Sequence, residues 1–337
     1  MVRKREIICE YAPYIDQPPV SQAQLYGQAC SSDEVTVNAW RDTWIKNAQA
    51  NHKRFGSFRE KGLGKLWGKH RNSPIILAGS GPSLKENADE LLNNTHIPVI
   101  SCLHNFHFFE DKGIKVDYYV SLDAGPVTIE EVSEGGSKTA DEYWAITKDR
   151  TLLAYVSTDP RLLELWQGEI YFFNCPVPDK TVLDALDDLE KFGTMISTGG
   201  NVLGACSYIA KAILGCNPLA FIGADFCFSY SDKFHGWDSK YDKDLGHYVR
   251  ATDVFGNSVK TWQSYANFKC WFDSIAMRVP GTWINCSEGG TFGSYPQGNI
   301  RAVQQMDLKD FIGVYSLCEH TREQCEDPTT NVRKILF

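Results

Sequence analysis

The sequence predicts an α/β protein with a Rossmann-like, doubly wound and mostly parallel sheet, preceded by an N-terminal helical extension. From Pro74 onward, short continuous apolar runs alternate with segments of helical periodicity, as expected when helices cover both faces of a parallel sheet. Loops rich in glycine or acidic residues follow several of these runs. In such sheets ligands bind beyond the carboxyl ends of the strands, so these loops are the expected functional edge.

Residues 1–72 form the predicted extension. Residues 1–37 hold three prolines and no clear periodicity, and we expect them to be irregular, whereas residues 38–56 have helical spacing. The segment from Trp40 to Arg71 contains nine Lys/Arg and only two acidic residues, with five aromatic residues interleaved. That pattern suits nucleic acid or another polyanion. It also suits a helix that docks through its tryptophans and leaves its lysines solvated, and we favour docking.

Residues 73–300 form the predicted catalytic domain, and residues 301–337 a C-terminal helix and tail. A polar, aromatic-rich insertion is expected at 226–260. Strands are predicted at 75–78, 98–103, 118–122, 152–157, 169–173, 219–223 and 282–285. Helices are predicted at 83–92, 105–112, 160–166, 180–191, 200–214, 261–278 and 303–312.

The first candidate loop leads from a strand through two glycines into a helix. Gly79 and Gly81 permit a sharp turn, and Ser80 lies between them. Ser83 with Glu86 has the spacing of a capping box. Outward-facing amides at this helix start would bind phosphate, although a tight turn without any ligand has the same pattern.

A second loop of the same kind lies at Thr198, Gly199, Gly200 and Asn201. It opens a helix that is apolar nearly all round, so its backbone amides could hold the other half of a diphosphate. The alternative is a plain helix cap made by Thr198.

Acidic residues and one histidine follow the other strands. Asp123 and Asp225 each stand at the carboxyl end of a strand, where an acid can act as a base, hold a ribose hydroxyl or bind a metal ion. His235 could be a general base, and Glu288, which precedes Gly289, could orient a sugar hydroxyl. The alternatives are a turn-initiating Asp, a surface His and an ordinary loop acid.

Bulk features exclude other classes of protein. No apolar run approaches 18 residues, and the first ten residues lack the apolar core of a signal peptide, so we expect a cytoplasmic protein. The eleven cysteines contain no Cys-x-x-Cys pair, which fits reduced thiols rather than a disulfide framework. The net charge is −8, yet residues 1–72 carry 12 Lys/Arg against 7 Asp/Glu.

Taken in order, these motifs resemble one family, the motility-accessory-factor (Maf) glycosyltransferases and the MptE-like 6-hydroxymethylpterin diphosphokinases. The shared pattern is a Gly-x-Gly-Pro-Ser-Leu turn, a strand ending in Ser-Leu-Asp, a Gly-Gly helix start, an Ile-Gly-x-Asp strand and a late Asn-x-x-Glu-Gly-Gly loop. It spans about residues 74–300.

The resemblance implies a Rossmann-like fold and one of two activities. Maf proteins transfer nonulosonic acids from a CMP-activated donor to flagellin, and MptE-like enzymes move diphosphate from ATP to a pterin alcohol with Mg²⁺. Related stand-alone chains occur in bacteriophages. Because Phe226-Cys227-Phe228 replaces the run found in many relatives and the long flanking domains of Maf proteins are missing, flagellin is not the expected acceptor. By position, the resemblance assigns nucleotide and active-site loops to Gly79, Gly81, Ser83, Asp123, Asp225, Glu288 and Gly289.

Three hypotheses follow. The first is a glycosyltransferase that moves a sugar from a nucleotide-sugar donor to a hydroxyl acceptor, which could be a protein or a nucleic acid bound through residues 40–71. The second is an ATP-dependent diphosphokinase, with Mg²⁺ held by Asp123 and Asp225. The third is a non-catalytic binding module. A homo-oligomer remains open in all three.

Overall fold

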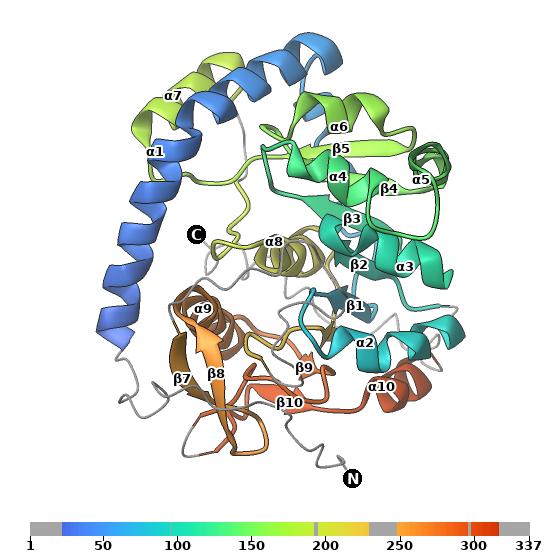
Figure 1. The fold of residues 1–337 in the computed structure, drawn as a ribbon, viewed down its shortest axis with the longest axis vertical. Coiled ribbons are helices and arrows are strands. Elements are labelled where there is room, and N and C mark those ends of the chain that lie inside the picture. The colour runs from blue at the N-terminus through green and yellow to red at the C-terminus, as the bar shows by residue number, and fades with distance from the viewer. Residues whose placement is uncertain (1–21, 95, 192–194, 229–247, 296–297, 317–337) are drawn as a thin grey trace. The chain divides into compact units, whose positions relative to one another are not determined.

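A computed structural model of the chain describes residues 22–94, 96–191, 195–228, 248–295 and 298–316, with the backbone alone for residues 22–33. The chain divides into two compact units, unit 1 (residues 1–29, 70–99 and 215–337) and unit 2 (residues 30–69 and 100–214). Parallel strands with intervening helices confirm the predicted α/β fold (Figure 1). The boundaries predicted after residues 72 and 300 stay predictions. None of the helices described here combines the length and the apolar character needed to span a bilayer.

Unit 1 contains four parallel strands in the order β10-β9-β6-β1. Phe221 of β6 lies at the centre of its core, stacked on Trp283 and in edge contact with Phe272 and Phe292. The strands are β1 (Ile75–Ala78), β6 (Leu219–Ile222), β9 (Trp283–Asn285) and β10 (Val303–Gln305). The helices are α2 (Leu84–Asn87), the 3-10 helix η4 (Ala88–Asn93), α9 (Gln263–Arg278) and α10 (Leu308–Tyr315).

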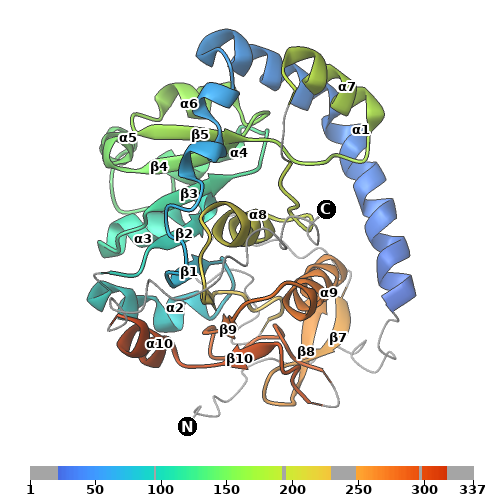
Figure 2. The same cartoon turned by 180° about the vertical axis from the view of Figure 1, so that it is seen from behind.

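The insertion predicted at 226–260 contains an antiparallel hairpin where it is described, β7 (Tyr248–Thr252) and β8 (Ser258–Trp262). The hairpin leads directly into α9, which lies beside it in both views (Figures 1 and 2). The helix predicted at 261–278 therefore starts two residues later than expected. The helix predicted at 303–312 is wrong at its start, because β10 pairs with β9 and α10 begins only after Asp307.

Unit 2 holds four parallel strands in the order β2-β3-β4-β5. They are β2 (Val99–Cys102), β3 (Tyr118–Ser121), β4 (Thr151–Tyr155) and β5 (Glu169–Phe173). Three expected helices are present, α3 (Phe106–Lys112), α6 (Pro160–Leu165) and α7 (Lys180–Leu189). A fourth, predicted at 200–214, is α8 (Val202–Tyr208) followed by a π-helical stretch, Ile209–Ile213. Two short helices were not predicted, α4 (Val127–Ser133) and α5 (Ala140–Ile146).

Helix α1 runs from Gln22 to Phe55. It begins well before the expected residue 38, so the prediction of an irregular segment is wrong for residues 22–37. The sequence gives no warning, since this stretch is polar and the prolines that suggest irregularity lie upstream at 13, 18 and 19.

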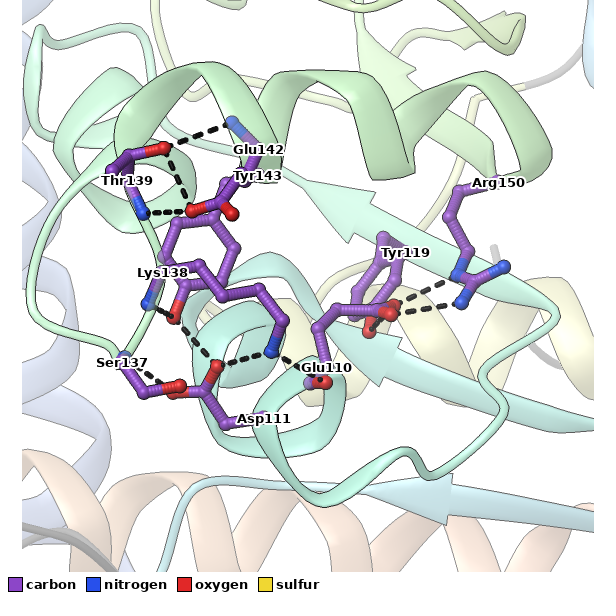
Figure 3. Close-up of polar contacts among 9 residues, drawn as sticks. All are labelled: Glu110, Asp111, Tyr119, Ser137, Lys138, Thr139, Glu142, Tyr143 and Arg150. Carbon is purple, nitrogen blue, oxygen red and sulfur yellow. Dashed lines mark hydrogen bonds and ion pairs between the residues drawn. The ribbon is translucent and has the colours of Figure 1, made fainter.

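A buried ion pair ties α3 to the strands of unit 2 (Figure 3). The Glu110 carboxylate of α3 accepts two hydrogen bonds of 2.8 Å from the Arg150 guanidinium and one of 2.9 Å from the Tyr119 hydroxyl. Burial, the Glu110 charge and this hydrogen bond together raise the pKa of Tyr119 well above its usual value, so it stays a neutral donor.

Next to this ion pair, Asp111 fixes the turn between α4 and α5 (Figure 3). Its carboxylate accepts bonds of 2.7 Å from Lys138 Nζ, the Tyr143 hydroxyl and the Ser137 amide. Helix α5 then begins with a capping box made by Thr139 and Glu142. The turn that leads into α5 is therefore tied to α3 through Asp111.

Candidate active site

The glycine turn after β1 is closed on itself within unit 1. The amides of Gly79 and Gly81 donate to the carbonyls of Ile222 and Gly223, both at 2.9 Å. The amide of Ser83 donates to the Asp225 carboxylate at 3.2 Å. The expectation that these three amides face outward is therefore wrong. Helix α2 is a single turn before it becomes a 3-10 helix, so its macrodipole is small.

Asp225 caps this turn from the loop that follows β6. Its side chain is buried, and Oδ2 also accepts a 2.7 Å bond from the Ser83 hydroxyl. The predicted Ser83–Glu86 capping box is wrong, because Ser83 has a helical backbone and its hydroxyl bonds to Asp225. A Cβ on Gly81 would lie 2.2 Å from Asp225 Oδ2, so only glycine fits there. A catalytic or metal-binding role for Asp225 stays a prediction.

The loop after β9 packs on the same acid from the other side. Thr291 donates to the Asp225 carbonyl through its amide and its hydroxyl, at 2.7 and 3.0 Å. Gly289 is buried, and its carbonyl accepts a bond from Asn285. Glu288 has a left-handed backbone (φ 56°), and its Oε1 lies 3.5 Å from the Leu308 amide at the start of α10. His235 lies outside the described residues.

In unit 2, Asp123 leaves β3 at its carboxyl end and remains accessible to solvent. Protein atoms nevertheless surround its carboxyl group on most sides. Burial by these atoms and, to a smaller extent, the negative charge of Glu131 raise the pKa of Asp123 to about 6, and His104 opposes the rise. Because water reaches the group, screening limits the energetic cost of its charged form.

Sequence reasoning missed the two neighbours of Asp123. His104 lies directly after β2 in the 3-10 helix Leu103–Asn105, and Glu131 lies on α4. His104 Nδ1 is 2.9 Å from Glu131 Oε1, and both side chains are mostly buried. The histidine and the acid are therefore paired at hydrogen-bond distance. Because β2 and β3 are parallel neighbours, both loops leave the same sheet edge.

The second glycine loop stands before α8. Asn201 caps this helix by accepting the Gly204 amide at 2.9 Å, while the Thr198 hydroxyl accepts the Gly200 amide at 3.2 Å. The alternative of a cap made by Thr198 is therefore wrong. Gly199 and Gly200 both have positive φ, 57° and 81°, which explains the glycines. Phosphate binding at this loop stays a prediction.

The metal site predicted at Asp123 and Asp225 stays a prediction. Within the described residues, no group of three or more His, Cys, Asp and Glu side chains has the arrangement of a metal site. Oδ2 of Asp225 already accepts two bonds from Ser83.

The basic segment 40–71 is docked on unit 2 through several polar contacts. Arg41 pairs with Asp179 at 2.6 Å, and Arg54 pairs with Glu164 at 3.1 Å. Glu190 accepts bonds from the Ser57 hydroxyl and from the amide that follows it. These contacts confirm that α1 docks, but the expectation that it docks through buried tryptophans is wrong, because Trp40 and Trp67 remain 37% and 36% exposed. Nucleic-acid binding through this segment stays a prediction.

Comparison with known proteins identifies a family and a similar fold among solved structures. The family described as 6-hydroxymethylpterin diphosphokinase MptE-like matches residues 42–231, more than half of the chain. This range contains the loops after β1, β2, β3 and β6, including His104, Asp123 and Glu131. No curated protein matches the chain.

One fold neighbour is the solved structure of MAf glycosyltransferase from Magnetospirillum magneticum AMB-1, with a TM-score of 0.52 and 18% sequence identity. The match covers 70% of this chain and 34% of the solved one, so this chain spans about a third of that length. At this identity the match shows the shared fold. The family match carries the assignment, and this chain belongs to the MptE-like family.

Proposed function

We propose that the chain is a transferase that moves a sugar from a nucleotide-sugar donor to a hydroxyl acceptor, with Asp123 as the general base. The observation that carries this proposal is the accessible Asp123 carboxyl at the end of β3, whose pKa of about 6 lies close to neutral pH. A general base is most effective when its pKa is near the working pH. The fold shared with a glycosyltransferase supports the choice of donor.

In the proposed reaction, Asp123 takes the proton from the acceptor hydroxyl as its oxygen attacks the anomeric carbon of the donor. The new bond joins the acceptor oxygen to that carbon. The bond that breaks joins the same carbon to the phosphate oxygen, and the nucleotide leaves with the electron pair. Burial and the charge of Glu131 raise the pKa of this base towards neutral pH, and His104 opposes that rise. We expect the loop Thr198–Asn201 to contact the donor phosphates.

A diphosphokinase is the second candidate, and the description of the matching family favours it. There the acceptor oxygen would attack the β-phosphorus of ATP and release AMP. The same base would serve, because both reactions begin with a hydroxyl that must lose its proton.

The test follows nucleotide release from CMP-, UDP- and GDP-sugars, and from ATP with Mg²⁺, in the presence of small alcohols and sugars as acceptors. We expect one nucleotide sugar to turn over, and Asp123→Asn to reduce the rate by about 10²–10⁴-fold. Asp117→Asn, at the opposite end of β3, is the matched control and should remain active. Full activity of Asp123→Asn would rule out Asp123 as the general base. Turnover of ATP alone would favour the diphosphokinase.

A further inference from the structure

Asn47 of α1 joins two loops at the carboxyl edge of unit 2. Its side chain is buried, and the amide nitrogen Nδ2 donates both hydrogens, to the Ala124 carbonyl at 2.9 Å and to the Ser157 carbonyl at 3.1 Å. Ala124 follows Asp123 directly, and Ser157 lies in the loop after β4. One side chain therefore fixes the exit of β3 against the exit of β4.

Asn51 lies one helical turn later on the same face of α1 and makes similar hydrogen bonds to different residues. Its Nδ2 donates to the carbonyls of Val156 and Thr158, at 2.9 and 2.8 Å. Both acceptors belong to the loop after β4. Asn51 thus matches Asn47 in burial and in donated bonds, and both of these bonds go to the loop after β4 rather than to the segment that carries Asp123.

The Asp123 segment is also enclosed from two sides. Gly125 lies against the Trp40 ring of α1, so close that a Cβ on this glycine would be 2.9 Å from the ring. From α4, the Thr128 hydroxyl donates to the Gly125 carbonyl at 3.0 Å. The short run from Asp123 to Gly125 is therefore held between α1 and α4.

We propose that Asn47 is a positioning residue for Asp123, and that α1 thereby determines the position of the Asp123 carboxylate at the sheet edge. The catalytic consequence rests on the proposed function, whereas the positioning itself rests on the two hydrogen bonds of Asn47. The charged groups that face Asp123, His104 from the loop after β2 and Glu131 from α4, act on the carboxyl only while it is held there. α1 is then part of the site as well as a docking helix.

The catalytic test compares Asn47→Ala with its matched control Asn51→Ala. Each variant loses two buried hydrogen bonds, so the two should lose thermal stability to a similar degree. We expect Asn47→Ala alone to lower kcat, by roughly ten-fold, with the donor KM little changed and with the acid limb of the pH–rate profile displaced. Equal effects of both variants on kcat and on that profile would overturn the positioning role.

A second measurement needs no activity. Aspartate carboxyl groups labelled with ¹³C are titrated by NMR in the wild type and in both variants, and Asp123→Asn identifies the Asp123 signal. We expect the titration midpoint of Asp123 to move by at least about half a pH unit in Asn47→Ala. In Asn51→Ala the midpoint should stay at its wild-type value. An unmoved midpoint in folded Asn47→Ala contradicts the inference even if Asp123 proves to be the base. A moved midpoint with a fully active Asp123→Asn keeps the positioning and rejects the proposed function.

Discussion

Two aspartates of unit 2 show how local surroundings decide what a carboxyl group can do. Burial alone would raise the pKa of Asp111, but hydrogen bonds from Lys138, Tyr143 and Ser137 outweigh it and lower the value to about 2. At Asp123 burial and the charge of Glu131 act together, and the pKa rises to about 6. Asp111 is therefore a fixed anion that organises a turn, and Asp123 is a group that can exchange a proton near neutral pH.

The raised pKa of Asp123 makes stability depend on pH. A folded-state pKa above the ordinary value of 3.8 contributes stability that is complete below 3.8 and is lost as the pH rises through about 6. Asn cannot ionise, so Asp123→Asn should be more stable than the wild type at pH 8, by on the order of 1 kcal/mol after solvent screening. Urea unfolding from pH 4 to 8 should show the gain shrinking towards pH 4. A gain that is constant with pH would contradict the assignment.

At the same scale, His104 and Glu131 mark the limit of sequence reasoning. His104 directly follows a predicted strand, as Asp123 does. A search for polar residues after strand ends, which identified Asp123, could therefore have found His104. Nothing in the sequence indicates that Glu131, on an unpredicted helix, reaches back to that histidine. Ser83 shows the opposite failure. Its spacing to Glu86 is that of a capping box, but its hydroxyl bonds instead to Asp225, which is distant in the sequence.

At the scale of elements, strands were predictable because burial on both faces requires an unbroken apolar run. The runs at 75–78, 169–173 and 219–223 coincide with β1, β5 and β6, within one residue. Short elements were not predictable, since α4 and α5 owe their place to contacts such as those of Asp111 rather than to a long periodic pattern. Residues 303–305 read as helix in isolation, and pairing with β9 makes them a strand.

The Glu110–Arg150 pair yields a prediction for how α3 is held. Removing one partner of a buried ion pair leaves an uncompensated charge, so Arg150→Ala should lower the free energy of unfolding by about 3–5 kcal/mol. The exposed pair of Arg54 with Glu164 is the control, and Arg54→Ala should cost less than about 1 kcal/mol. Urea unfolding measures both. Equal costs would show that the buried pair contributes no more than a surface one.

At the scale of the molecule, the family match and the fold neighbour carry the names of two different transferases. The matched family is described by a diphosphokinase, and the fold neighbour is a glycosyltransferase of which the match covers 34%. Neither decides the chemistry, because the proposed base, Asp123, would serve the acceptor step of both reactions. The donor must be identified by its binding, separately from turnover.

Donor binding should raise the thermal stability of the whole chain. A ligand present at 100 times its Kd adds about 2.7 kcal/mol to the free energy of unfolding, which for a chain of this size is a rise in Tm of several degrees. We expect this rise with one nucleotide sugar. It should persist in Asp123→Asn, since that residue acts on the acceptor, and shrink in Asn201→Ala, where the loop Thr198–Asn201 loses the cap that orders it. A rise with ATP and Mg²⁺ alone would assign the donor site to a diphosphokinase. Equal rises in wild type and Asn201→Ala would place the donor phosphates away from that loop.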